Sequence, residues 1–393
     1  MNCPVSAQVF VLAMTSGNCR KVTVVDSPTT VTANAENSTT EVMAEETGTP
    51  RVRPRRTSTR VAVYGTKWAL RRQEVGAAAG LVMLCVVFGA LSGAFLSWSQ
   101  FQNDSLVTAQ YAIIATGVTL LMIAGEFDLT VGVVFAACPM AMAYLYVDHH
   151  WNAVLALIVA LLGACLMGSI NGVLVTRMRL PSFIVTLGMM FFWLGILVAL
   201  TNGYPIALPL FAKEPLLLTI MGGQVGSWPL YAPVLWAVVI VAVGAYILEL
   251  TPWGNWIFAT GSNVIAARNL GVPVRAVKFV GFVLSALLAG LAGCLILAFQ
   301  SSASPTQGGN LELEAIVAAV VGGTALTGGV GSVLGSVVGA AIIAVAGSGL
   351  VLVGAPSEWY TAIVGLILIV SVLVNMEISG AKGKSLLGLR GWS

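Results

Sequence analysis

The chain has 393 residues, of which 58% are hydrophobic and 9% are charged, and its mean hydropathy is +0.92. Soluble proteins average about 25% charged residues, so this composition excludes a water-soluble protein. Apolar runs of about 20 residues without alternation predict membrane-spanning helices and exclude a β-barrel. The net charge is +3, but 10 of the 19 basic residues precede residue 73, which indicates an orientation signal beside the first membrane helix and no nucleic-acid partner.

The N-terminal segment, residues 1–72, is rich in Thr, Ser, Glu, Pro and Arg. Such a composition cannot bury a core, so we predict a disordered, basic, cytoplasmic tail. Met43 opens a more ordinary start for a membrane protein, and initiation at that residue is an alternative.

Ten apolar spans follow the tail. They cover 76–98, 106–124, 131–147, 152–176, 183–201, 230–250, 279–299, 314–326, 332–353 and 358–376. The third span is near the lower length limit for crossing a bilayer and the eighth is well below it. The predicted fold is therefore all-α and polytopic, with about ten transmembrane helices, some broken or re-entrant. We expect a transmembrane domain over 73–376 and a tail over 377–393.

Basic residues in the short loops give the orientation. They fall in three groups: Arg177 and Arg179; Arg268, Arg275 and Lys278; and Lys382, Lys384 and Arg390. Positive residues concentrate on the cytoplasmic side of membrane proteins. Ten alternating spans place all three groups inside, so both termini are predicted to be cytoplasmic.

Two apolar stretches are interrupted by the same pattern, G-x-x-x-L-T-x-G, at 125–132 and at 322–329. Each interruption is either a loop at the membrane surface or a break where half-helices meet at depth. Paired glycine-interrupted segments in the two halves of a chain point to a transport site. The predicted helix-break glycines are Gly125, Gly132, Gly322, Gly323, Gly328 and Gly329.

The first interruption contains two carboxylates, Glu126 and Asp128. Charge inside a membrane is costly and marks function. Either acid could bind a coupling proton or cation, but we favour capping of a half-helix through accepted backbone N–H bonds. Asn171 has two similar interpretations, as a hydrogen bond between helices or as a contact to solute.

The internal loop 251–278 contains the signals of a short helix. Ser262 or Asn263 can cap its start, and Gly271 suits its end. Isolated helices this short are unstable in water, so we expect it to dock on a partner subunit or, alternatively, on the chain's own loops. The sequence has neither a complete phosphate-binding motif nor a Cys or His cluster with metal-ligand spacing, so no metal site, resident cofactor or bond chemistry is predicted.

Over roughly residues 76–376 the chain resembles the permease subunit of bacterial ATP-binding-cassette (ABC) importers for monosaccharides, of the ribose, xylose and galactose type, in the branched-chain amino acid and ribose permease superfamily. Four motifs carry the resemblance in the family's order: Gly125–Gly132; Asn171-Gly172 with Leu180–Gly188; Gly261–Gly271; and Leu313–Ile316 running into Gly322–Ser332.

The resemblance implies a transport subunit in the bacterial cytoplasmic membrane, not an enzyme. It implies a second permease copy, a cytoplasmic ATPase that binds ATP and Mg²⁺, an external sugar-binding protein, and membrane lipid as partners. The coupling residues are then Gly261, Asn263, Ala266, Ala267, Arg268 and Gly271. Ile265 stands where the family usually has a glutamate, which puts an ion pair at that point in doubt.

The expected solute is a neutral, hydroxyl-rich sugar or polyol. The candidate pathway residues are Glu126, Asp128, Thr130, Asn171, Thr186, Thr324 and Thr327. Two alternatives remain: a proton-coupled secondary transporter of a small polar solute, with Asp128 or Glu126 as the carrier, and a structural or sensor membrane protein.

Overall fold

The computed structural model describes residues 73–209, 215–224, 230–356 and 358–380. All of them belong to one unit, Ser58–Ser393. The predicted N-terminal tail and residues 381–393 lie outside the described residues.

The described chain is almost entirely helical. In chain order its elements are α2 (Gln73–Leu91), the short 3-10 helix η1 (Gly93–Leu96), α3 (Trp98–Ile123), α4 (Val131–Val147), α5 (Ala153–Met178), α6 (Ser182–Thr201), β1 (Ile206–Ala207), α7 (Pro215–Gly222), α8 (Ala232–Leu250), α9 (Pro252–Ser262), α10 (Val264–Asn269), α11 (Val274–Gln300), β2 (Ser302–Ala303), α12 (Leu311–Val321), α13 (Val333–Leu352) and α14 (Trp359–Gly380). Among the described residues, six helices are long and apolar enough to cross a membrane: α3, α5, α6, α8, α11 and α13.

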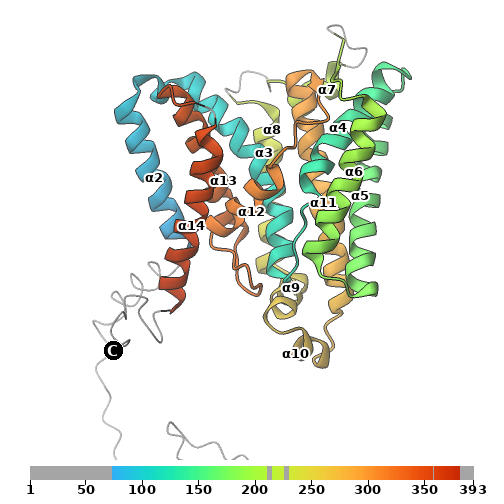
Figure 1. The fold of residues 1–393 in the computed structure, drawn as a ribbon, viewed down its shortest axis with the longest axis vertical. Helices are drawn as coiled ribbons and strands as arrows, with labels where there is room; N and C mark the ends of the chain where they lie inside the picture. The colour runs from blue at the N-terminus through green and yellow to red at the C-terminus, as the bar shows by residue number, and fades with distance from the viewer. Residues whose placement is uncertain (1–72, 210–214, 225–229, 357, 381–393) are drawn as a thin grey trace, which may run out of the picture. The chain divides into compact units, whose positions relative to one another are not determined.

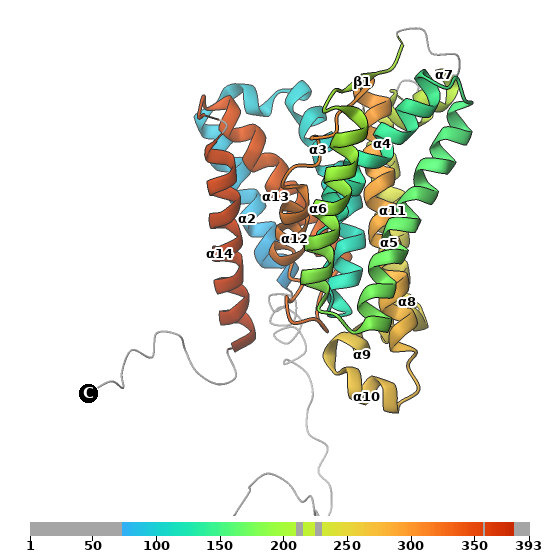
Figure 2. The same cartoon turned by 45° about the vertical axis from the view of Figure 1, so that its right-hand side comes forward.

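The long helices alternate in direction along the bundle (Figures 1 and 2). The short helices α9 and α10 lie at one end, which we call the α10 end, and α7 lies at the other, the α7 end. At the α7 end, β1 and β2 pair as a two-residue antiparallel ribbon. Helix α2 begins and α14 ends at the α10 end, so these two helix ends lie on the same side of the bundle.

Helix α11 forms the centre of the bundle and packs against α3, α4 and α5. Small residues allow this close approach. A Cβ added at Gly168 would meet the Phe282 carbonyl and the Ala286 side chain of α11, and one at Gly293 would collide with the Phe135 carbonyl of α4. Membrane helices associate by such packing because lipid provides no hydrophobic driving force between them.

Each of the ten predicted spans contains a helix, but several boundaries differ. Helix α3 begins at Trp98, eight residues before the predicted span, because the Ser97 hydroxyl accepts a bond from the Gln100 amide. Helix α11 begins at Val274, so Lys278 lies in a helix and not in the loop. Helix α14 continues to Gly380, four residues past its predicted end and into the predicted tail.

Candidate functional site

The first interruption is a loop that returns into the protein. Gly125, at φ +84°, ends α3 with paired bonds, from its own amide to the Met122 carbonyl (2.9 Å) and from the Glu126 amide to the Leu121 carbonyl (3.2 Å). This is the Schellman ending that glycine favours. The chain is exposed at Gly125 and fully buried from Asp128 onward. The return segment, residues 124–130, therefore begins at the α10 end and leads to a half-helix start inside the bundle.

Three predicted pathway residues form one buried hydrogen-bond chain. Asn171 of α5 donates from Nδ2 to Thr130 Oγ1 (2.8 Å), and Thr130 donates from both its hydroxyl (2.6 Å) and its amide (3.0 Å) to Asp128 Oδ1. All three side chains are inaccessible to solvent. Asp128 thus accepts the backbone N–H of Thr130, the residue before α4, and Asn171 bonds between α5 and the return segment.

Two oxygens of this chain, Asp128 Oδ2 and Asn171 Oδ1, are buried without a partner among the described residues. Ser285 of α11 lies beside the Asp128 carboxyl. Buried polar atoms without partners are costly and in native proteins usually meet water or a ligand. The two oxygens can therefore each accept a further hydrogen bond at a position close to α11.

The second interruption ends α12 in the same way, one residue out of step with the sequence alignment. Gly323, at φ +97°, bonds to Val320 O (2.9 Å), and Thr324 bonds to Ala319 O (2.9 Å). Gly323 is thus the equivalent of Gly125, where the alignment pairs Gly125 with Gly322. The two segments then differ, since Thr130 is buried whereas Thr327 is exposed on the turn between α12 and α13.

The remaining predicted residues lie apart from one another. Gly132 breaks no helix and is the second residue of α4, pressed against Gly308 and Glu312. Thr186 is buried and donates to its own helix at Ser182 O (2.8 Å). Thr324 is buried with no partner for its hydroxyl among the described residues. Glu126 pairs with Lys278 of α11.

Three of the sequence motifs meet at one point, the glycine junction, formed by Gly125, Gly261, Gly328 and Gly329. A Cβ at Gly261 would collide with the Ile123 carbonyl and lie 2.5 Å from the Gly329 amide nitrogen. That amide donates to the Ile123 carbonyl (2.8 Å). The end of α9 is thereby wedged between the end of α3 and the turn that precedes α13.

Helix α10 forms as the sequence predicts. Asn263, not Ser262, caps it by accepting bonds from the amides of Ile265 and Ala266 (3.0 Å each), and Gly271 ends it at φ +82°. Ala267 is buried against the chain, with 2% of its surface exposed. Ile265 and Leu270, in contrast, are 73% and 83% exposed.

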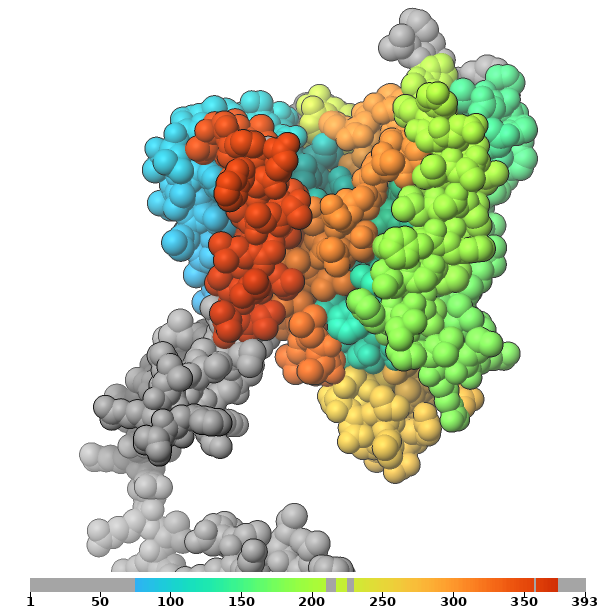
Figure 3. Space-filling view, in the orientation of Figure 1, coloured from blue at the N-terminus to red at the C-terminus, as the bar shows by residue number. Residues whose placement is uncertain are grey.

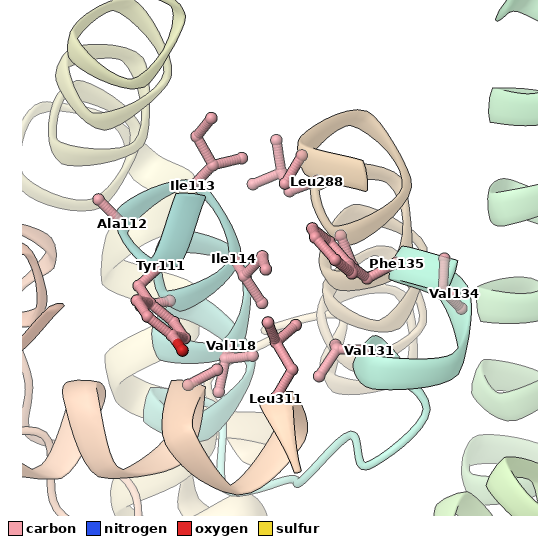
Figure 4. Packing of buried hydrophobic residues seen from close by; sticks show 14 of the residues in the cluster. Tyr111, Ala112, Ile113, Ile114, Val118, Val131, Val134, Phe135, Leu288 and Leu311 are labelled. Atoms are coloured by element: carbon pink, nitrogen blue, oxygen red, sulfur yellow. The ribbon is translucent and has the colours of Figure 1, made fainter. Parts of the chain in front are cut away.

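A cavity that the sequence analysis missed lies where α4 and α12 begin. It has a volume of about 260 Å³, with Thr306, Asn310 and Glu312 as its polar lining and Ala136, Met190 and Leu194 as part of its apolar lining. Figure 4 shows Val131 of α4, Leu311 of α12 and Val118 of α3 packed together within the bundle. The sequence contains a signal for this site, because Asn310 followed by Glu312 and Glu314 is typical of a helix start. The predicted span began at 314 and therefore left this start out.

Helix α12 has 11 residues, a length of about 16 Å, roughly half the thickness of a bilayer core. Its first turn carries Glu312 and Glu314, and Glu314 accepts a hydrogen bond from Tyr111 of α3 (2.5 Å). The space-filling view shows the surface hollowed between α6 and α14, with α12 at its floor (Figure 3). Polar groups at membrane depth are therefore open to one face of the molecule.

Comparison with known proteins places these features in context. A family model described as the permease component of branched-chain amino acid transport systems matches residues 101–372. The ribose import permease protein RbsC of Escherichia coli (strain K12) is 35% identical over 315 residues, which cover 79% of this chain and 96% of that protein. The probable ABC transporter permease protein y4mJ of Sinorhizobium fredii is 34% identical over 79% and 92%, and the autoinducer 2 import system permease protein LsrC of Photorhabdus laumondii is 33% identical over 78% and 91%.

Proposed function

Because the chain belongs to this family of ABC transporter permeases and is a multi-pass membrane protein, not an enzyme, we propose that it forms the pathway of an importer for a sugar or a similarly hydroxyl-rich solute. The cavity at the starts of α4 and α12 carries the proposal. Threonine, asparagine and glutamate side chains offer both donors and acceptors to hydroxyl groups. Its volume suits one small solute.

The relatives support the solute class. One relative imports ribose by name and another imports autoinducer 2 by name. The described membrane spans contain no lysine or arginine near this cavity that could hold an anion. We therefore assign the cavity to a neutral solute, delivered by an external binding protein.

The α10 end is assigned to the cytoplasm of a bacterial inner membrane. Arg179, Arg268, Arg275 and Lys278 all gather there, in keeping with the rule that positive loops stay inside. A separate ATPase then docks on α10, whose Ile265 and Leu270 present apolar surface to water. Apolar contacts at position 265 take the place of the ion pair that a glutamate would form.

A second copy of the chain is assigned to the hollow between α6 and α14. Exposed polar residues at membrane depth need water or protein beside them, not lipid. Two copies facing each other across this hollow would enclose a polar pathway. ATP-driven movement of α10 would then switch it between outward and inward openings.

The test is uptake by the transporter purified from its native membrane with its partners and reconstituted in vesicles. We expect an ATPase in one copy per permease, and sugar uptake that needs ATP and the binding protein and survives a proton uncoupler. Uptake that the uncoupler abolishes at constant ATP would replace this proposal with the proton-coupled carrier. A chain that purifies without an ATPase would remove α10 from its docking role.

The proposed contact between α10 and the ATPase can be tested separately with a double variant. Replacing Ile265 and Leu270 together by serine should reduce ATPase retention at least about tenfold, since two largely exposed apolar side chains would be lost from a desolvated contact. Leu200→Ser is the matched control, because Leu200 is 79% exposed at the α7 end of α6. Equal ATPase retention by the double variant and the control would contradict the assignment.

A further inference from the structure

A second cavity, of about 320 Å³, opens at the α10 end and shares no lining residue with the cavity at the starts of α4 and α12. Its walls come from the return segment, the α5–α6 connection, α10 and the first turns of α11. Its charged side chains are Arg179, Arg268, Arg275, Lys278 and Glu126. Four cations thus face one carboxylate.

The charges in this cavity are not balanced. Glu126 forms its ion pair with Lys278, the two side chains being 12% and 17% exposed. Within the described parts of the chain, no acidic or other side chain pairs with the guanidinium groups of Arg179, Arg268 or Arg275. Arginine binds phosphate through two parallel N–H bonds, so three unpaired guanidinium groups around one cavity form a phosphate-binding arrangement.

Arg179 holds an unusual backbone conformation at this site. It is the C-cap of α5 and lies in the left-handed region, at φ +59° and ψ +32°. Glycine or asparagine fits that position more easily. The arginine places a cation on the cavity wall at a cost in backbone strain, and such strain concentrates at functional sites.

The surroundings indicate that the phosphate belongs to a lipid. Leu180, Phe183 and Ile184 follow Arg179 in the chain and are 46%, 56% and 66% exposed. The rest of the described chain covers little of α6, so the first turns of this helix leave apolar surface exposed beside the cavity. The cavity therefore lies where the apolar side of the bundle meets the cytoplasmic surface, at the depth of lipid headgroups.

We propose that this cavity binds the phosphodiester headgroup of an anionic phospholipid of the cytoplasmic leaflet, with its acyl chains along the first turns of α6. Basic cavities between helices on the cytoplasmic side suit such headgroups. Because Arg268 belongs to α10, the bound lipid would lie beside the ATPase-docking helix.

The experiment uses the full chain in a neutral detergent. Native mass spectrometry measures how many copies retain one phosphatidylglycerol or one phosphatidylcholine of equal chain length during titration. Wild type should retain phosphatidylglycerol at concentrations about tenfold lower than phosphatidylcholine. Replacing Arg179 and Arg275 together by glutamine should bring this preference within about twofold.

Arg177→Gln is the matched control, because Arg177 is exposed in the last turn of α5 but does not line the cavity. It should keep the wild-type preference. A double variant that also keeps it would overturn the proposal. Inorganic phosphate that displaces phosphatidylglycerol at low millimolar concentration would overturn the lipid source in favour of a soluble phosphate. If the double variant lost its ATPase but retained lipid as the wild type does, the cavity would be a protein-docking site and the lipid proposal would be overturned.

Discussion

Thr130 joins two residues that the sequence analysis treated separately. Its single hydroxyl accepts from Asn171 and donates to Asp128, so it determines the orientation of both groups. The remaining oxygens of these neighbours, Asp128 Oδ2 and Asn171 Oδ1, have no hydrogen-bond partner among the described residues. Removing the hydroxyl would leave the buried Asp128 carboxylate and the buried Asn171 amide each with one hydrogen bond fewer.

Thr130→Val should therefore lower the free energy of unfolding by about 1–3 kcal/mol, although the two side chains are nearly the same size. Reversible unfolding in mixed detergent micelles measures this loss. Thr130→Ser keeps the hydroxyl and is expected to cost less than about 1 kcal/mol. Equal losses for valine and serine would mean that packing of the methyl group, not the hydrogen bonds, stabilises the return segment.

Single residues with local roles were predictable, and residues with distant partners were not. Asn263 and Gly271 act on amides and carbonyls within a few positions of themselves, so the sequence identifies them as caps. The pairing of Glu126 with Lys278 joins positions 152 apart and depends on how α11 packs. The sequence could indicate that Glu126 was unusual but could not supply its partner.

The glycine junction acts between elements. It brings the end of α9 against the end of α3 and the turn before α13, with backbone contacts that leave no space for a side chain. Gly261 of α9 packs against both the Ile123 carbonyl and the Gly329 amide, which are hydrogen-bonded to each other, so we expect a movement of α9 to act on α3 and on the turn before α13. The junction thus links α9, which leads into α10, to both interruptions.

Gly261→Ala should destabilise the protein by about 1–3 kcal/mol through overpacking, and should also reduce uptake more than stability alone explains. Thermal unfolding and uptake by the same reconstituted samples measure both effects. Gly195→Ala is the control, since a Cβ at Gly195 in α6 meets nothing within 4 Å. If Gly261→Ala were as stable and active as this control, the junction would have no mechanical role.

Elements with strong periodicity or length were predictable from the sequence, and irregular ones were not. Repeated glycines identified both interruptions, because helix endings of this type need a residue with positive φ. The alignment was displaced by one residue since Gly322 and Gly323 both satisfy the pattern. Helix α12 was placed three residues too late, because its first turn is charged and periodicity measures apolar residues only.

The whole molecule has a hollow between α6 and α14, with α12 at its floor, and the first turn of α12 carries Glu312 and Glu314 (Figure 3). If that hollow belongs to a water-filled pathway, exposed positions within it will react with water-soluble reagents, whereas equally exposed positions against lipid will not. A thiol in hydrocarbon cannot ionise, and the thiolate is the reactive form.

In a cysteine-free background, Asn310→Cys should therefore react with a hydrophilic maleimide in native membranes at least about tenfold faster than Leu162→Cys. Both positions are exposed in the isolated chain. Leu162 lies on α5, on a side of the bundle that we expect to face lipid, whereas Asn310 precedes α12. The rate is measured by gel shift, and bound solute should slow it at position 310. Equal rates at the two positions would mean that lipid fills the hollow.

Helix α12 also constrains how the chain enters its membrane. With 11 residues and two glutamates in its first turn, it is too short and too polar to partition into a bilayer on its own. Its carboxylates find their place only when Tyr111 of α3 and the backbone of Gly132 are already beside them. We therefore expect the first half of the chain to be in place before this segment settles, and the last three helices to complete their insertion late and as a group.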